Sequence, residues 1–281
     1  MALNNTAPIF IGGLMRSGTT LARAMLAQHS AIASGLETHW FDIDWPAQQA
    51  RGGEPLREYL HRIGDFFAVG ADAVDAHMAA ADSAAAYLDL FMGAITRASG
   101  KRRWAEKTTG NIRHLDAILA YWPRAMIIHV VRDPRDIFAS FRRSKKYGGI
   151  TDFANLWCDY LGDVARFKSA LPLDESNYLE LHYEALVRDP VGEMQGVIRF
   201  LGEDWEDAVG RFDGKADEHD RVLGLTGHSS TTLEQIAHPL SQSRVGLGQS
   251  SINDAEMAVA RTVAAERGLG ELFARIEREA R

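Results

Sequence analysis

Eight residues near the N-terminus have the types and spacing of a loop that binds phosphate. The segment Gly13 to Thr20, GLMRSGTT, matches the pattern G-x-x-x-x-G-K-[ST] except that Thr19 stands at the lysine position. In a nucleoside triphosphatase, that lysine reaches the β- and γ-phosphates and the next hydroxyl holds magnesium. Without it, the loop amides, Arg16 and two hydroxyls suit a single terminal phosphate at a helix N-terminus. The plain alternative is a tight turn that caps a helix.

A second basic cluster directly follows the apolar run MIIHVV at 126–131. Arg132 abuts this run, and Ser140 lies two turns inside the helix that is expected to follow. An arginine at the carboxyl end of a strand and a hydroxyl on the next helix can both reach one phosphate monoester. For Lys145 and Lys146, pairing with the helix dipole on a solvated face is the favoured interpretation. Two separate anion sites are suited to a nucleotide that carries phosphate groups at both ends of its ribose.

Strands that alternate with helices are expected to position both clusters. Continuous short apolar runs are typical of buried parallel strands. The expected strands are 8–12, 102–107, 126–131 and 178–183. The expected helices are 20–29, 111–122, one that begins near Pro134 and stops at two glycines, 152–169 and 190–201. The alternation predicts an α/β protein with a three-layer, P-loop-like fold, in which helices flank a central, mostly parallel sheet.

Other parts of the chain give weaker signals. Residues 47–99 are rich in helix-favouring side chains, so two or three helices are expected there, with interruptions at Gly52–Gly53 and Gly70. Residues 214–251 contain much Gly, Ser, Thr and His without clear periodicity. From 253 to 281 the pattern predicts one or two amphipathic helices.

Composition and charge exclude several classes of protein. Hydrophobic residues make up 46% and charged residues 25% of the 281 residues, which is typical of soluble globular proteins. The 31 basic and 38 acidic residues give a net charge of -7, so neither nucleic acid nor an anionic membrane is an expected partner. The single cysteine, Cys158, forms no intrachain disulfide and favours a reducing, cytoplasmic location. The N-terminal apolar run is expected to be a strand rather than a signal peptide.

Four segments, in order along the chain, resemble the sulfotransferases that use 3′-phosphoadenosine 5′-phosphosulfate (PAPS). IFIGGLMRSGTTLARAMLAQHS, followed by SGLETHWF, is similar to the opening of that family, most closely of its tyrosylprotein sulfotransferase branch. VVRDPRDIFAS resembles the family's 3′-phosphate motif, and LHYEALVRDPVGEMQGVIRFLG resembles the strand and helix after it. HSSTTLEQIAHPLSQSRVG is a weaker match. The resemblance runs from about Ile9 to Gly246 and implies a soluble member of the bacterial type.

The resemblance implies how the nucleotide is held. The loop residues that it places at the 5′-phosphosulfate end are Arg16, Ser17, Gly18, Thr19 and Thr20. The residues that it places at the 3′-phosphate are Arg132 and Ser140. Tyr183 matches a tyrosine that contacts the nucleotide.

Two basic positions near the 3′-phosphate motif have alternative interpretations. The branch has a further arginine where this chain has Ser144, so Arg142 or Arg143 is the expected substitute. Arg244 is expected to help with the 3′-phosphate, and a surface salt bridge is the alternative role for it.

The resemblance also implies a catalytic base. Glu37, in GLET, falls at the position of the branch's catalytic carboxylate, and His39 stands where the branch has arginine. A carboxylate at the edge of a cleft can accept the proton of a hydroxyl, especially where partial burial raises its pKa. His39 is expected either to bind substrate or to pack beside Trp40, which is a second candidate for substrate binding.

Three further residues are implied at the leaving group. Lys107, in WAEKTTGN, matches a lysine that faces the oxygen bridging phosphate and sulfate, and Ser243, in SQSRVG, matches a serine with the same target. A fixed ammonium stabilises charge that grows on the departing phosphate, so it acts more on the transition state than on the ground state. Arg16 is expected to assist, and no metal ion is required.

The implied reaction is an in-line transfer of a sulfuryl group to an acceptor hydroxyl. A P-loop kinase for small molecules is one alternative, but the loop lacks its lysine and no strand-to-aspartate magnesium site follows Val131. A catalytically silent nucleotide-binding protein of the same fold is the other. The sequence leaves open the acceptor, whether peptidyl tyrosine, sugar, lipid or small metabolite, and the oligomeric state. We expect one domain over 1–281, in which about 47–99 is a helical insertion on the acceptor side.

Overall fold

The computed structural model describes residues 6–42, 54–144, 148–226 and 231–280. Within these ranges, five parallel strands form one sheet in the order β2-β3-β1-β4-β5. The strands are β1 (Ile9–Gly12), β2 (Ile32–Ala33), β3 (Arg103–Lys107), β4 (Met126–Val131) and β5 (Tyr178–His182). Ile9 of the central strand β1 lies opposite Ala105 of β3 and Met126 of β4. The parallel sheet expected from the apolar runs is confirmed.

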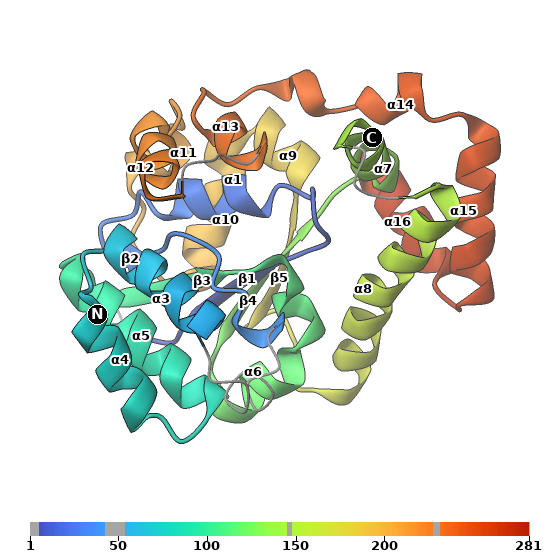
Figure 1. Ribbon diagram of the computed structural model, residues 1–281. Helices are drawn as coiled ribbons and strands as arrows, with labels where there is room; N and C mark the ends of the chain where they lie inside the picture. The colour runs from blue at the N-terminus through green and yellow to red at the C-terminus, as the bar shows by residue number, and fades with distance from the viewer. Residues whose placement is uncertain (1–5, 43–53, 145–147, 227–230, 281) are drawn as a thin grey trace.

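Helices cover both faces of this sheet (Figure 1). The helices before β4 are α1 (Thr19–Leu26), η1 (Trp40–Asp42), α3 (Glu54–Phe66), α4 (Ala71–Ala80), α5 (Ala84–Ala98), η2 (Thr109–Arg113) and α6 (Leu115–Tyr121). Those between β4 and residue 210 are α7 (Pro134–Ser144), α8 (Ile150–Ala170), α9 (Tyr183–Arg188), α10 (Pro190–Leu201) and α11 (Asp207–Gly210). The last ones are α12 (Ala216–Thr226), α13 (Thr231–Ile236), η3 (Gln242–Arg244), α14 (Leu247–Ser251), α15 (Asp254–Glu266) and α16 (Gly270–Glu279).

The alternation of side chains along the strands divides the core in two. Phe10 of β1 packs in the core that includes buried residues of α5, α6 and α8. Its neighbours Ile9 and Ile11 pack in the other core, with α1 and α10. Successive side chains of a strand point to opposite faces, so a continuous apolar run fills both cores. The expected three-layer architecture is confirmed.

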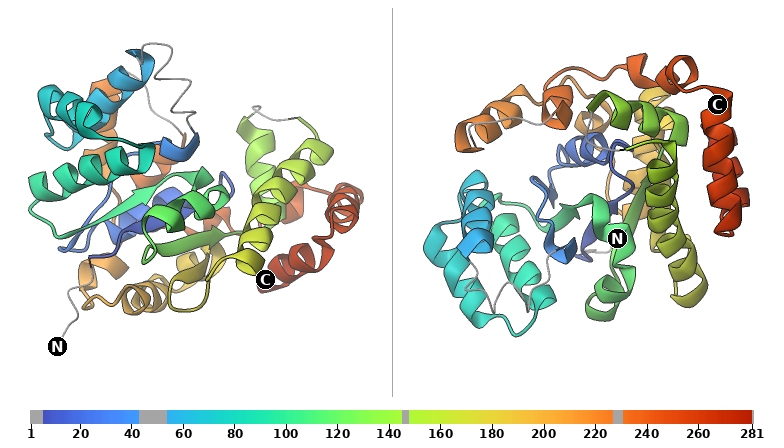
Figure 2. Two further views of the ribbon diagram at one scale, coloured as in Figure 1. Left: turned by 90° about the horizontal axis from the view of Figure 1, so that it is seen from below. Right: turned by 45° about the vertical axis from the view of Figure 1, so that its right-hand side comes forward.

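The segment expected to hold two or three helices contains α3, α4 and α5 in its described part. Gly70 lies directly before α4, as expected, whereas Gly52 and Gly53 lie outside the described residues. These helices gather at one end of the molecule, while α8, α15 and α16 lie at the opposite end (Figures 1 and 2).

Although residues 214–251 show no clear periodicity, the structure has α12, α13, η3 and α14 there. These helices are short, and tertiary contacts stabilise them where local periodicity is weak. The buried guanidinium of Arg23 on α1, for example, forms a two-pronged ion pair with Glu218 of α12. The sequence also does not predict β2, whose two residues are too few to show a pattern.

The carboxyl ends of parallel strands lie at one edge of the sheet, so the segments that follow β1, β3, β4 and β5 meet there. One direct contact between these segments is the hydrogen bond from the backbone N–H of Gly13 to the carbonyl oxygen of Thr109, at 3.1 Å. In the described ranges, no helix is long and apolar enough to cross a membrane.

Candidate active site

The loop between β1 and α1 is a compact turn at the N-terminus of α1. Gly18 precedes α1 with a φ of 98°, a left-handed conformation that glycine adopts without strain. A Cβ atom there would lie 2.3 Å from Cδ2 of Tyr183, so the tyrosine ring also requires glycine. Arg16 has a φ of 73°, and such conformations in residues other than glycine are concentrated at functional sites. The first N–H groups of α1 have no acceptor within the helix, so they suit an anion.

Arg132, directly after β4, joins three segments of the site. Its Nη1 donates to the carbonyl oxygen of Arg16 at 3.0 Å, and its Nη2 donates to that of Arg244 at 2.6 Å. Its guanidinium carbon lies 4.2 Å from the centre of the Tyr183 ring. Its Nε is buried and has no hydrogen-bond partner among the described residues. One charged N–H therefore has no protein partner there, and a buried donor of this kind is costly unless something satisfies it.

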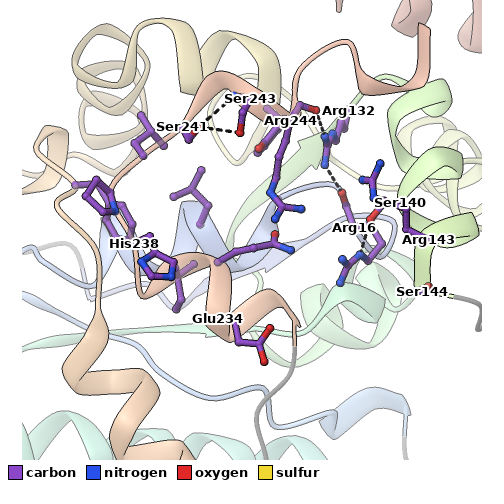
Figure 3. A pocket seen from close by; sticks show the side chains of 18 residues that line it. Arg16, Arg132, Ser140, Arg143, Ser144, Glu234, His238, Ser241, Ser243 and Arg244 are labelled. Atoms are coloured by element: carbon purple, nitrogen blue, oxygen red, sulfur yellow. Dashed lines mark hydrogen bonds between the residues drawn. The ribbon is translucent and has the colours of Figure 1, made fainter. Parts of the chain in front are cut away.

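The two expected phosphate sites meet at Arg16 and Ser140. Nε of Arg16 donates to Oγ of Ser140 on α7 at 2.9 Å (Figure 3). Arg16 is expected at the 5′ end and Ser140 at the 3′ end, yet in this structure they form one cluster. The physical reason is that β1 and β4 are adjacent, so their loops are neighbours and a long arginine side chain spans the gap.

A cavity of about 590 Å³ opens beside this cluster (Figure 3). Among its described lining residues are four arginines, Arg16, Arg132, Arg143 and Arg244, against one carboxylate, that of Glu234. Burial lowers the pKa of Arg143, and the positive charges of Arg244 and Arg132 lower it further. Mutual repulsion between guanidinium groups is relieved when an anion binds among them. The cavity is therefore suited to a polyanionic ligand.

The structure distinguishes the two expected substitutes for the arginine missing at Ser144. Arg143 and Ser144 both line the cavity. Arg142 instead forms an ion pair with Glu256 and donates to the carbonyl oxygen of Ser251 at 2.8 Å. Arg143 is thus the residue positioned to compensate. Lys145 and Lys146 lie outside the described residues.

Asp136 of α7 holds the segment that carries Ser243 and Arg244. Its carboxylate accepts hydrogen bonds from the backbone N–H groups of Gly246, at 2.8 Å, and Gly248, at 2.6 Å. The side chains of Ser243 and Arg244 line the cavity as a result (Figure 3).

Glu37 and Lys107 form an ion pair beside the start of α1. Lys107 ends β3, and its buried Nζ also donates to Oγ1 of Thr20 at 3.1 Å. Burial raises the pKa of Glu37, but the charge and hydrogen bond of Lys107 outweigh it, so this pKa is lowered from 4.5. The net shift is therefore opposite to the effect that partial burial alone would have. Burial lowers the pKa of Lys107, although the Glu37 carboxylate opposes that effect.

A buried carboxylate fixes the segments on both sides of this ion pair. Glu106 precedes Lys107, and its Oε1 accepts from Oγ1 of Thr38, at 2.8 Å, and of Thr108, at 2.7 Å. Its Oε2 accepts from Nδ2 of Asn111 at 2.6 Å. Thr38 follows Glu37, so Glu106 ties the loop of Glu37 to the end of β3. No motif in the sequence indicates this role, although a charged residue within a buried strand is a usable signal.

His39 and Trp40 lie on opposite sides of the same turn. The side chain of His39 is 45% exposed, and its Nε2 lies 3.2 Å from Oε2 of Glu37. Trp40 is buried, stacks on Tyr87 and donates from Nε1 to the carbonyl oxygen of Ala84 at 2.5 Å. The expected contact of Trp40 with substrate is therefore not supported, since its indole anchors the turn in the core.

The structure brings most of the expected residues to one edge of the sheet, in two groups. The cavity group contains Arg16, Gly18, Arg132, Ser140, Tyr183, Ser243 and Arg244. The acid–base group contains Glu37, His39, Lys107 and Thr20. Ser17, in the loop, and Thr19 and Thr20, at the start of α1, are buried. Among the described contacts none joins Ser243 to Lys107, which the resemblance places at one target.

Comparison with known proteins agrees with this geometry. The family model described as the sulfotransferase family matches residues 8–207. Protein-tyrosine sulfotransferase 2 of Gallus gallus is 28% identical over 248 residues, which are 83% of this chain and 60% of that protein. The chain thus spans about three fifths of the length of the curated relatives it matches.

Solved structures share the fold. The sulfotransferase domain of the Synechococcus PCC 7002 olefin synthase superposes with a TM-score of 0.66 at 23% identity, over 94% of this chain and 98% of that one. Mouse sulfotransferase SULT7A1, complexed with PAP, superposes with a TM-score of 0.54 at 14% identity, over 98% of this chain and 88% of that one. With the family model covering most of its length, the chain belongs to the sulfotransferase family.

Proposed function

We propose that this chain transfers the sulfuryl group of PAPS to the hydroxyl group of an acceptor. The observation that carries the proposal is the position of α1. Gly18, at its N-terminal cap, lines the arginine-rich cavity, and Thr20, two residues on, contacts the buried ammonium of Lys107. The N-terminal end of α1 thus lies between the cavity proposed for a polyanionic nucleotide and the ion pair of Glu37 and Lys107.

The residues present fit such a nucleotide. The orphaned Nε of Arg132 is a donor for an anion, and Gly18 lines the cavity at the N-terminus of α1, where the first N–H groups of the helix suit a phosphate. Residues proposed for the 5′-phosphate end are Arg16, Ser17, Gly18, Thr19 and Thr20. Residues proposed for the 3′-phosphate and nucleoside are Arg132, Ser140, Arg143, Tyr183 and Arg244. PAP bound to a family member of the same fold supports the choice of ligand.

Each catalytic side chain has a distinct task. The ion pair with Lys107 keeps Glu37 in its carboxylate form, so Glu37 is ready to accept the proton of the acceptor hydroxyl. Lys107 supplies positive charge where the departing phosphate becomes more negative. Arg16 and Ser243, which line the cavity, assist it. PAPS supplies an activated sulfuryl group, and the transfer needs no metal ion.

Peptidyl tyrosine is the acceptor that the names of the curated relatives favour, with sugars and small metabolites as alternatives. The insertion reaches the proposed base, because the hydroxyl of Tyr59 on α3 donates to the carbonyl oxygen of Glu37. We therefore propose one domain in which the helices within 47–99 face the acceptor.

Thermal unfolding with added nucleotide tests the proposal. PAP at 100 times its Kd should stabilise the fold by about 2.7 kcal/mol, whereas ATP with magnesium should do so weakly, because the loop has no lysine for its γ-phosphate. Transfer of ³⁵S from labelled PAPS to phenol, alcohol and sugar acceptors then identifies the reaction. Equal stabilisation by both nucleotides, or no transfer to any acceptor, would contradict the proposal.

A further inference from the structure

His39 lies between two carboxylates at the exposed side of the ion pair. Its Nε2 is 3.2 Å from Oε2 of Glu37, and its Nδ1 is 3.4 Å from Oδ2 of Asp42. Glu37 uses its other oxygen, Oε1, for Lys107. Since the His39 side chain is 45% exposed, a continuous path of polar atoms runs from the buried ammonium through Glu37 to solvent.

The position of His39 is built into the fold. Its φ of 50° is a left-handed conformation that costs roughly 1–3 kcal/mol for a residue other than glycine. Its backbone N–H donates to Oγ1 of Thr108 at 3.0 Å, and Thr108 in turn donates to Glu106. Asp42 lies against Gly110, where a Cβ atom would be 2.2 Å from Oδ1 of Asp42. The fold thus leaves room for the carboxylate that faces His39.

The charges around His39 favour its protonated form. The hydrogen bond to Asp42 raises the pKa of His39 above 6.5, and the carboxylates of Glu37 and Glu106 add to this, although burial opposes it. Lys107 and His114 lie beyond the two carboxylates, and His114 is 3.6 Å from Oδ1 of Asp42.

Two aromatic neighbours complete the surroundings. The ring of Tyr59 is 6.3 Å from that of His39, and burial and the charge of Glu37 raise the pKa of Tyr59, so it stays neutral. Phe41 stacks on His114 and carries no charge. Among the described neighbours of Glu37, His39 is therefore the group whose charge changes near neutral pH.

We propose that His39 is a proton relay that removes the transferred proton from Glu37 after each turnover. This inference rests on the proposed function. As the acceptor oxygen bonds to sulfur, the bond from sulfur to the oxygen that bridges it to phosphate breaks and PAP leaves. The O–H bond of the acceptor breaks as well, and its proton moves to Oε2 of Glu37. Neutral His39 takes that proton on Nε2, with Asp42 holding the Nδ1–H, and the imidazolium releases a proton to water. Protonated His39 cannot accept, so turnover falls as pH decreases through the pKa of His39.

The relay depends on an imidazole at position 39, because a guanidinium or an ammonium there would not release its proton near neutral pH. If His39 only bound the acceptor, a fixed charge or a hydrogen bond would be enough. A relay also requires His39 to gain and lose a proton, so a turnover that follows the titration of His39 distinguishes the relay from a role in binding.

NMR titration of the histidine imidazoles tests the relay without requiring activity. The pKa of His39 should exceed 6.5 in the wild type and should fall in both Asp42→Asn and Glu37→Gln, since each change removes a negative neighbour. His61→Gln is the control, because His61 pairs with Asp75 at 2.9 Å and has no described contact with Glu37. An unchanged His39 titration in both variants overturns the proposal.

The pH dependence of kcat provides the second measurement, with ³⁵S-labelled PAPS and p-cresol as probes. The acidic limb should follow the His39 pKa, so Asp42→Asn should move it to lower pH and His61→Gln should not. A limb that stays in place in Asp42→Asn overturns the relay. Absence of transfer by the wild type to any acceptor refutes the proposed function instead, and the NMR result remains a separate test of the coupling.

His39→Gly allows a chemical rescue experiment, in which added imidazole replaces the missing side chain. Glycine suits a φ of 50°, so the backbone has no reason to change. We expect kcat to fall roughly 10²-fold, the low end for proton-transfer catalysis, and added imidazole to restore part of it. Rescue that depends on the pKa of a series of substituted imidazoles supports the relay. Loss without rescue, in a variant that still binds PAP with the wild-type Kd, overturns it.

Discussion

Glu37→Gln tests the proposed base most directly. Glutamine keeps the length and shape of the side chain but cannot take up a proton. Turnover should therefore fall by roughly 10²–10⁴-fold, the usual range for general acid–base catalysis. The affinity for PAP should stay near that of the wild type, because Glu37 is not among the described residues that line the cavity proposed for the nucleotide.

The cost to stability follows from the burial of the ion pair. The Lys107 side chain is 3% exposed and that of Glu37 is 27% exposed. Removing one partner of a fully buried pair costs about 3–5 kcal/mol. Here the glutamine oxygen still accepts from the ammonium and one partner is partly hydrated, so we expect about 1–3 kcal/mol. A typical domain stability of about 5–15 kcal/mol tolerates this loss.

Single-turnover rates at saturating PAPS measure the chemical step, and calorimetry measures PAP binding. Glu203→Gln is a matched control, because Glu203 is a buried carboxylate paired with Arg102 and Arg103 away from the site. It should lose stability but keep turnover. Near-normal turnover of Glu37→Gln, where chemistry limits the rate, would refute Glu37 as the base. An equal loss of turnover in Glu37→Gln and Glu203→Gln would indicate that the effect arises from lower stability instead.

Three further changes test the binding loop and its surroundings. Arg132→Ala removes charged hydrogen bonds and should raise the Kd for PAP by roughly 10–100-fold with less effect on kcat; an unchanged calorimetric Kd would assign Arg132 to structure. Gly18→Ala should lower the free energy of unfolding by more than about 1 kcal/mol, and more than Gly268→Ala, which has a φ of 73° but no atom within 4 Å of a new Cβ; equal denaturant midpoints would contradict the contact with Tyr183. Burial raises the pKa of Glu184 from 4.5 to about 6. Folding therefore favours its protonated form, and the contribution of Glu184 to stability should fall by about 2 kcal/mol as pH rises through 4.5–6; the difference in stability between wild type and Glu184→Gln, measured by denaturation at several pH values, should show this slope.

Local sequence patterns were sufficient for four of the five described strands, all but β2, and for the loop after the central strand. The runs IFIG and MIIHVV are apolar at every position except one glycine and one histidine, so each predicts a strand buried on both faces. The glycines around Arg16 predict a turn before a helix, since they mark where the backbone must bend. These signals depend on residues that lie a few positions apart along the chain, so a single sequence is enough to reveal them.

The resemblance of short segments identified the candidate site residues but not their partners. Arg16 is separated from Ser140 by 124 residues, and Lys107 from Glu37 by 70. No periodicity links positions so far apart. Their contacts depend on the strand order β2-β3-β1-β4-β5, which brings the loops after different strands to one edge.

Tertiary structure alone decided the electrostatics of the site. Partial burial by itself raises the pKa of a glutamate near a cleft, yet the buried ammonium of Lys107 gives Glu37 a lowered pKa. The four donors on Glu106, the carboxylates on both sides of His39 and the buried indole of Trp40 follow from the same packing. Burial and charge add over all neighbours in space, whereas sequence patterns report neighbours along the chain, so the acid–base character of this site arises only when the sheet has assembled.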